Sequence, residues 1–173
     1  GSGKSELLRR WLLELSRRYS PAQLRIVAID FKGGATFVGL DSLPQISGIV
    51  TDLDEEIDRV CEALRAEVTR RERLFRENAV RDIVELSGQL ERLVVMIDEC
   101  ATLLSGSGTA AMLLADLSAR GRSLGIHLIL ATQRALGSIR EVVLANCGLR
   151  ISLRVLDSAE SIAMIGSPVA AQL

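Results

Sequence analysis

The sequence predicts an α/β fold in which a mainly parallel sheet carries helices on both of its faces. Three short apolar runs are expected to form buried strands, at residues 24–30 (LRIVAID), 93–98 (LVVMID) and 126–132 (IHLILAT). Segments with helical periodicity separate them, and this alternation is typical of a parallel sheet. Apolar residues make up 48% of the chain and aromatic residues only 3%, so we expect an aliphatic core.

Helices are expected wherever apolar residues recur at helical spacing between these strands. The first of them, at residues 5–19, places Leu8, Trp11 and Leu12 on one face. At 173 residues, the alternation fits a single domain over residues 1–173 that is truncated at both ends. The other expected elements are helices at 54–77, 80–90, 109–124, 138–145 and 157–165, and strands at 46–50 and 149–155.

The composition constrains the class of partner. The formal net charge is −1, so the chain lacks the overall basic balance of many nucleic-acid-binding domains, although a local basic patch or a basic ring in an oligomer stays open. Cys61, Cys100 and Cys147 lie far apart and form no CxxC pair, which is typical of structural thiols in a reducing compartment. No apolar run reaches the length of a membrane span, and the chain could still be one segment of a membrane protein.

Residues 1–5 (GSGKS) match the end of the phosphate-loop pattern G-x-x-x-x-G-K-[ST], whose first glycine would lie three residues before Gly1. Glycines let backbone N–H groups surround phosphate oxygens, and the helix that follows adds the partial positive charge of its N-terminus. Lys4 would reach the β- and γ-phosphates and Ser5 would bind Mg²⁺. An ordinary helix start without a ligand is the alternative. The expected nucleotide-contacting residues here are Gly1, Ser2, Gly3, Lys4, Ser5 and Glu6.

The segment at residues 93–99 (LVVMIDE) has the Walker B form, a buried strand that ends in two acids. Asp98 would hold Mg²⁺ together with Ser5, and Glu99 would act as general base on the attacking water. A strand that ends in a solvated acidic turn is the alternative. The phosphate-loop pattern upstream favours the Walker B interpretation.

The strand expected at 24–30 lies between the phosphate loop and the Walker B strand in the sequence. An added strand in that position, with a glutamate after the Walker B aspartate, predicts a RecA-like P-loop NTPase fold whose first strand is missing from the chain. Gln133, in the ATQR that ends the next strand, could sense the γ-phosphate; a simple strand-end turn is the alternative.

Four segments in this order resemble the FtsK/SpoIIIE ATPases: GSGKS, VAIDFKGG, VVMIDE, and GRSLGIHLILATQR with LANCGLRISLRV after it. Within that family, GSGKSELLR and DFKGGATFVGLDSLP are most similar to the EccC/EssC ATPases of type VII secretion. DNA translocases of the family more usually have a DPK-type motif in place of DFKGG. The closing segment departs from the family, because Val169 stands where an aspartate is more usual.

The resemblance implies a role for each matching residue. Lys4, Ser5, Asp98 and Glu99 match the nucleotide and Mg²⁺ positions, so the site is expected to be catalytically competent. Asp30 and Lys32 match the DFKGG positions near the γ-phosphate, where Lys32 either contacts nucleotide or braces the loop. Family members also complete the site with an arginine from a neighbouring subunit. Arg150 is the first candidate for that arginine, and Arg122 and Arg120 are alternatives.

The resemblance also implies a function and a setting. It predicts an ATPase with ATP and Mg²⁺ as its nucleotide and metal, which powers protein export through a type VII secretion system. Expected partners are sister ATPase domains in a hexameric ring and secreted protein substrates. The chain would be a cytoplasmic part of a bacterial protein that other segments anchor in the membrane. The alternatives are a DNA-translocating ATPase of the same family and a nucleotide-binding regulatory module with little turnover.

Overall fold

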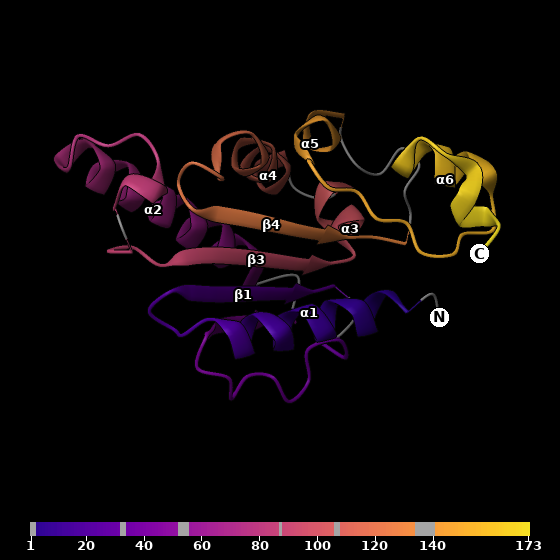
Figure 1. The fold of residues 1–173 in the computed structure, drawn as a ribbon, viewed down its shortest axis with the longest axis horizontal. Helices are drawn as coiled ribbons and strands as arrows, with labels where there is room; N and C mark the ends of the chain where they lie inside the picture. Colours follow the sequence, from indigo (N-terminus) through magenta and orange to yellow (C-terminus); the bar gives the residue numbers. More distant parts are fainter. Residues whose placement is uncertain (1–2, 32–33, 52–55, 87, 106–107, 134–140) are drawn as a thin grey trace.

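Four parallel strands form the sheet at the centre of the molecule, in the order β2-β1-β3-β4. Figure 1 shows β1, β3 and β4 side by side. The computed structural model describes residues 3–31, 34–51, 56–86, 88–105, 108–133 and 141–173. The pairing places Asp30 opposite Asp98, and Asp98 opposite Ala131, so three strands end level with one another. The strands are β1 (Leu24–Asp30), β2 (Ile46–Val50), β3 (Arg92–Asp98) and β4 (Ile126–Ala131).

Helices cover both faces of this sheet, because successive strand residues point to opposite sides. On one face, Leu8 and Leu12 of α1 (Lys4–Arg18) belong to the same buried cluster as Val94 and Met96 of β3. On the other face, Val95 and Ile97 share a second cluster with α2 (Glu56–Glu77) and α4 (Gly108–Arg120). The predicted α/β fold with helices on both faces is thereby confirmed.

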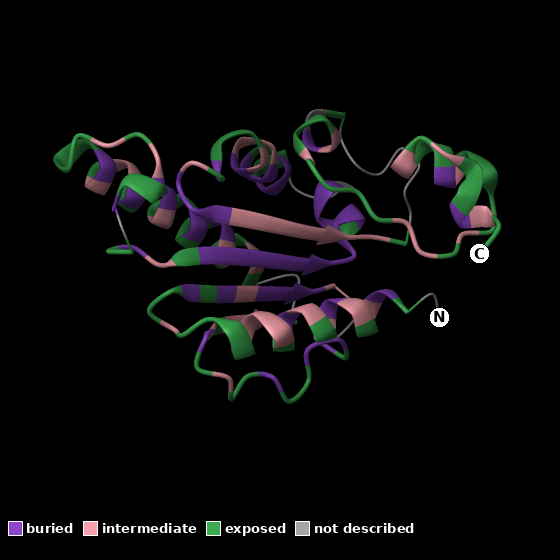
Figure 2. Ribbon diagram, viewed as in Figure 1, coloured by how far each residue is buried: buried purple, intermediate pink, exposed green. Residues whose placement is uncertain are grey.

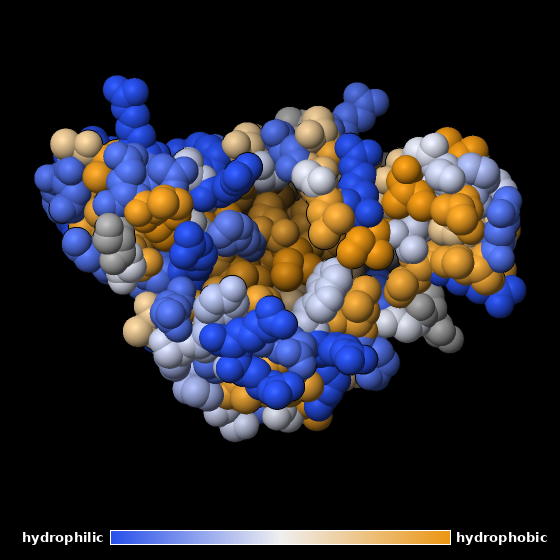
Figure 3. Space-filling view, viewed as in Figure 1, coloured by the Kyte–Doolittle hydropathy of each residue, from blue (hydrophilic) through white to orange (hydrophobic). Residues whose placement is uncertain are grey.

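Burial is deepest in the two central strands (Figure 2). Residues 93–98 of β3 are all buried, whereas β4 is buried at Ile126 and half-buried along the rest of its length. Ile129 and Ala131 on the α1 side of β4 are only partly covered. Figure 3 shows an apolar hollow beside α1 and a further apolar surface around the C-terminal helices.

Short elements connect and complete the layers. The helix α6 starts from Asp157, whose carboxylate accepts a hydrogen bond from the backbone of Ala159, and it ends at Gly166 in the left-handed region. Both ends therefore carry the capping residues expected for a helix. The short elements are the helices α3 (Cys100–Ser105), α5 (Glu141–Asn146) and α6 (Ser158–Ile165), and the 3₁₀ helices η1 (Ile83–Leu86) and η2 (Pro168–Ala171).

Two predicted elements are wrong. The segment at residues 149–155 forms no strand, and the Val155 N–H donates to the carbonyl of Ala170 in η2. Its apolar side chains Leu149 and Ile151 are exposed, so alternation alone did not create a sheet partner. The helix expected at 80–90 is reduced to the single 3₁₀ turn of η1. That turn buries Ile83 and Leu86 in the same core cluster as residues of α2 and β3.

No helix in the described part of the chain is long and apolar enough to cross a bilayer. Cys61 and Cys100 are buried, Cys147 is half-buried, and all three are free thiols.

Candidate functional site

The N-terminus of α1 lies at the end of the sheet where the parallel strands finish (Figure 1). Gly3 precedes it in the left-handed region, with φ 78°, a conformation that glycine adopts without steric cost. The chain then turns directly into the helix, and Lys4 is its first residue. The Lys4 side chain is buried and points toward Asp98, the last residue of β3, and Glu99, which follows it.

Lys4 forms ion pairs with both residues of the acidic pair. Its Nζ lies 2.5 Å from Oδ1 of Asp98 and 3.1 Å from Oε2 of Glu99. Burial lowers the pKa of the ammonium, but its hydrogen bonds and charge attraction to Asp98 and Glu99 outweigh that effect and leave the pKa above its ordinary value. Lys4 is therefore charged at neutral pH, and its single positive charge offsets part of the negative charge of the acidic pair.

Asp98 is fully buried and accepts two hydroxyl hydrogen bonds on its other oxygen. Ser5 Oγ donates to Asp98 Oδ2 over 3.1 Å, and Thr36 Oγ1 donates to the same oxygen over 2.8 Å. The backbone N–H of Thr36 also donates to Oδ2 of Asp30 over 2.8 Å. Three separate segments thus meet at the ends of β1 and β3.

Glu99 has a left-handed backbone conformation, with φ 60°, which directs its side chain back across the strand ends. Thr132 Oγ1 donates to Oε1 over 2.7 Å, and the backbone N–H of Gln133 donates to the same oxygen over 3.1 Å. Burial raises the pKa of this carboxyl, but the hydrogen bonds from Thr132, Gln133 and Lys4 lower it to about 2. Glu99 is accordingly ionised at neutral pH.

The residues present fit a magnesium nucleotide. A hydroxyl and a carboxylate, from Ser5 and Asp98, are already in contact, and oxygen ligands of these types are the ones that Mg²⁺ prefers. Lys4 and the first turn of α1 supply positive charge for phosphates. An open depression of about 270 Å³ adjoins them, lined by Ser5, Glu6, Arg9, Ala35 and Thr36.

Comparison with known proteins identifies the family of this chain. The model of the FtsK/SpoIIIE family matches residues 1–171. The chain belongs to the FtsK/SpoIIIE family. Its relatives include the ESX secretion system protein EccC of Thermomonospora curvata, to which it is 38% identical over 186 residues that cover 100% of this chain and 14% of that protein. The type VII secretion system protein EssC of Staphylococcus aureus is 32% identical, over 100% of this chain and 12% of that protein.

The solved structure of the cytoplasmic domain of the T. curvata type VII secretion ATPase EccC superimposes with a TM-score of 0.92 and 36% identity. The match covers 99% of this chain and 22% of that one, so the chain corresponds to a small part of these relatives. The predicted P-loop NTPase fold and the resemblance to the EccC and EssC proteins are confirmed.

Most of the predicted site residues of this FtsK/SpoIIIE chain come together. Lys4, Ser5, Asp98 and Glu99 are in direct contact, and Asp30 joins them through Thr36. The exposed side chain of Glu6 lines the depression beside them. Gly1, Ser2 and Lys32 lie outside the described residues.

Gln133 contacts the candidate site through its backbone. Its residue is exposed, and the contact to Glu99 comes from its backbone N–H. Thr132 and Thr36 supply hydroxyls that the sequence reasoning missed, although each lies within a motif already singled out, ATQR and DFKGGAT. Their positions could have identified them. Thr36 lies a few residues beyond β1, which ends on an acid, and Thr132 directly follows β4, whose neighbour β3 ends on an acid.

The three candidate arginines differ in availability. Arg150 is exposed and donates from Nη2 to the carbonyl of Leu144 over 2.8 Å. Arg122 is exposed in the turn before β4, at the edge of the sheet opposite the carboxyl ends. Arg120 is engaged by Asp116 over 2.7 Å and by Glu72, which makes it the least available of the three.

Proposed function

We propose that this chain binds ATP with Mg²⁺ and hydrolyses it, and that hydrolysis powers protein export through a type VII secretion system. The observation that carries the proposal is the contact of the Lys4 ammonium with both Asp98 and Glu99 at the N-terminus of α1. P-loop enzymes use a lysine, a metal-binding aspartate and a water-orienting residue in phosphoryl transfer. The relatives, which are secretion-system proteins by name, support the biological role.

Nucleotide binding requires Lys4 to change partners. In the structure its ammonium lies between two carboxylates. The β- and γ-phosphates carry more negative charge, and the first N–H groups of α1 point toward the same space. We therefore expect Lys4 to turn from Glu99 to the phosphates when ATP binds.

Ser5 and Asp98 would hold the metal ion. When bound there, the ion would supply positive charge that offsets the charge developing on the phosphate oxygens during transfer. The two side chains belong to different elements, α1 and β3, so an ion held by both would also tie the helix N-terminus to the sheet.

Glu99 would accept the proton of the attacking water. Its carboxylate is ionised, and Thr132 and Gln133 fix its orientation from the end of β4. When Lys4 moves to the phosphates, Glu99 loses a donor that lowers its pKa, and it becomes a stronger proton acceptor. Water then attacks the γ-phosphorus, the bond to the β–γ bridging oxygen breaks, and ADP and phosphate leave.

An arginine of a neighbouring subunit or sister domain would complete the site. We propose a hexameric ring with Arg150 as the first candidate and Arg122 as the alternative, because both are exposed. Secreted proteins are the proposed substrates. The chain would be a cytoplasmic part of a membrane-anchored bacterial protein, which the cytoplasmic EccC structure supports.

The proposal is tested by Glu99→Gln in the full-length protein, with ATP turnover and nucleotide binding measured separately. Loss of the proton acceptor lowers turnover by about 10²–10⁴-fold while binding is retained. Lys4→Ala serves as the binding-deficient reference, and Glu77→Gln, on the exposed end of α2, is the matched control. Wild-type protein that binds ATP but shows no turnover in its assembled form would instead identify a regulatory module.

A DNA-translocating function makes a different prediction. It requires turnover that DNA stimulates and that salt suppresses, because phosphate contacts release counterions. For a secretion ATPase, we expect turnover to respond instead to the C-terminal segment of a secreted substrate. Measuring turnover with each of the two added separately decides between them.

A further inference from the structure

We propose that Thr36 is a positioning residue that fixes the Asp98 carboxylate for Mg²⁺-dependent nucleotide binding. The inference rests on the proposed function, and it extends that function to a residue outside the phosphate loop and the Walker B strand. Thr36 lies beyond β1, in the loop that leads toward β2, yet its hydroxyl contacts the acid at the end of β3.

Three side chains contact the Asp98 carboxylate in the described part of the chain. Lys4 contacts Oδ1, while Ser5 and Thr36 both donate to Oδ2. When the nucleotide binds, we expect the Lys4 ammonium to move to the phosphates. The Ser5 hydroxyl oxygen would then coordinate the metal ion. Thr36 is the contact that has no second task, so its hydrogen bond can keep the carboxylate in one orientation throughout.

Thr36 is itself held from several directions. Its N–H donates to the buried carboxylate of Asp30 over 2.8 Å. Arg9 of α1 reaches the same loop, with Nη1 2.8 Å from the carbonyl of Val38 and 3.5 Å from that of Thr36. The next residue, Phe37, is fully buried in the cluster beneath α1.

This arrangement makes the Thr36 hydroxyl a rigid support. Thr36 is 7% exposed, so water has little access to replace its hydrogen bond to Asp98. Groups that orient a metal ligand in this way typically change metal affinity about 10–100-fold when they are removed. We expect removal of the hydroxyl to raise the Mg²⁺ concentration for half-maximal nucleotide binding about tenfold or more.

The test measures binding of a fluorescent, non-hydrolysable ATP analogue to the full-length protein as Mg²⁺ is titrated. The signal that Lys4→Ala removes is assigned to this site. Thr36→Val and Thr36→Ala lose the hydroxyl and are expected to show the shift, whereas Thr36→Ser keeps it and is expected to titrate like wild type. Thr69→Val is the matched control, because the Thr69 hydroxyl bonds the Arg65 carbonyl on α2, away from the site.

Two results overturn the inference while leaving the proposed function intact. One is an unchanged Mg²⁺ half-saturation in Thr36→Val and Thr36→Ala with folded protein by circular dichroism. The other is a Thr36→Ser variant that shifts as far as Thr36→Ala does. A third result would overturn the inference and the proposed function together. In that case the wild-type protein shows no Mg²⁺-dependent nucleotide binding that the Lys4→Ala substitution abolishes.

Discussion

Glu99 adopts a backbone conformation, with φ 60°, that a glutamate seldom takes. A left-handed conformation costs a residue with a Cβ roughly 1–2 kcal/mol. The geometry brings the carboxylate within hydrogen-bond reach of Thr132 and Gln133 at the end of β4. Those donors, together with Lys4, offset the cost of burying the charge and hold the pKa at about 2.

The lowered pKa predicts an acid-dependent loss of stability. A carboxyl whose pKa is about 2 when folded and 4.5 when unfolded stabilises the fold above pH 4.5, and this contribution disappears as the pH falls toward 2. We expect Thr132→Val to reduce that contribution, because a donor to Glu99 is lost.

Urea unfolding at pH 7 and pH 3 measures the contribution of the Glu99 carboxylate to stability. The decrease in unfolding free energy between the two pH values should be smaller in Thr132→Val than in wild type. Thr69→Val should behave like wild type, since its hydroxyl is bonded within α2. An equal decrease in Thr132→Val and wild type would contradict the prediction.

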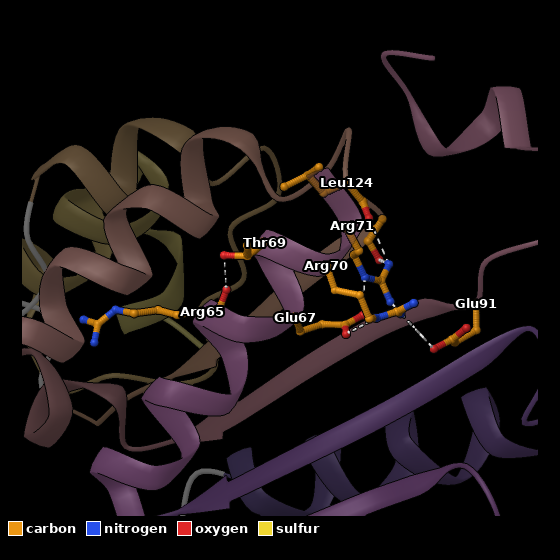
Figure 4. A network of polar contacts seen from close by, with 8 residues as sticks. Arg65, Glu67, Thr69, Arg70, Arg71, Glu91 and Leu124 are labelled. Atoms are coloured by element: carbon orange, nitrogen blue, oxygen red, sulfur yellow. Dashed lines mark hydrogen bonds and ion pairs between the residues drawn. The ribbon is translucent and has the colours of Figure 1, made fainter. Parts of the chain in front are cut away.

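At the scale of elements, Arg71 connects α2 to the opposite end of the sheet from the site (Figure 4). Its side chain is 1% exposed, and Nε donates to Glu67 over 2.6 Å on the same helix. Its Nη1 donates to the carbonyl of Leu124 over 2.9 Å, in the turn that leads into β4. Glu91, just before β3, lies 4.0 Å from Nη2. One guanidinium thus joins α2 to the starts of two neighbouring strands.

Replacing this guanidinium should destabilise the protein. Arg71→Met fills part of the space but leaves the buried carbonyl of Leu124 without its donor, so we expect the free energy of unfolding to fall by about 1–3 kcal/mol. Arg73→Met is the control on the same helix, because Arg73 is exposed and its contact with Glu77 is 3.6 Å long. We expect that control to change stability by less than about 0.5 kcal/mol. Urea denaturation compares the two, and similar values for both variants would contradict the role assigned to Arg71.

At the scale of the whole molecule, the site depends on the parallel sheet. Because β1, β3 and β4 run in the same direction and end level, acids and hydroxyls from distant parts of the chain meet at one edge. The N-terminus of α1 closes that edge from the side of the phosphate loop. Nucleotide binding therefore connects α1 with three strands, and it should stabilise the fold as a unit.

Magnesium and nucleotide together should raise the stability of the whole fold. A ligand at 100 times its Kd, bound only by the folded state, adds about 2.7 kcal/mol to the free energy of unfolding. Unfolding is followed with the ATP analogue and Mg²⁺, and again after EDTA removes the metal ion. Lys4→Ala should abolish the increase, and an increase that persists in this variant would place the nucleotide elsewhere.

Local patterns were sufficient to predict much of this fold. Apolar runs that end on acids located β1 and β3, and helical spacing located α1, because burial and periodicity are properties of the residues themselves. The same patterns failed at 149–155, where alternation was present but no strand of the described residues pairs with the segment. They also overestimated the length of the helix at 80–90, because the spacing of apolar residues does not distinguish a single buried helical turn from a helix of three turns.

The sequence by itself determined the chemistry of the candidate site: Lys4, Ser5, Asp98 and Glu99 were identifiable because each lies in a motif whose residue types are tied to phosphate and metal. The tertiary structure alone decided which groups orient them. Thr36 and Thr132 are ordinary hydroxyl residues in sequence, and they matter because the parallel sheet brings their loops to the carboxylates of Asp98 and Glu99. Hydrogen bonds between segments 33 and 62 residues apart depend on how strands are ordered and aligned, and local sequence does not encode that arrangement.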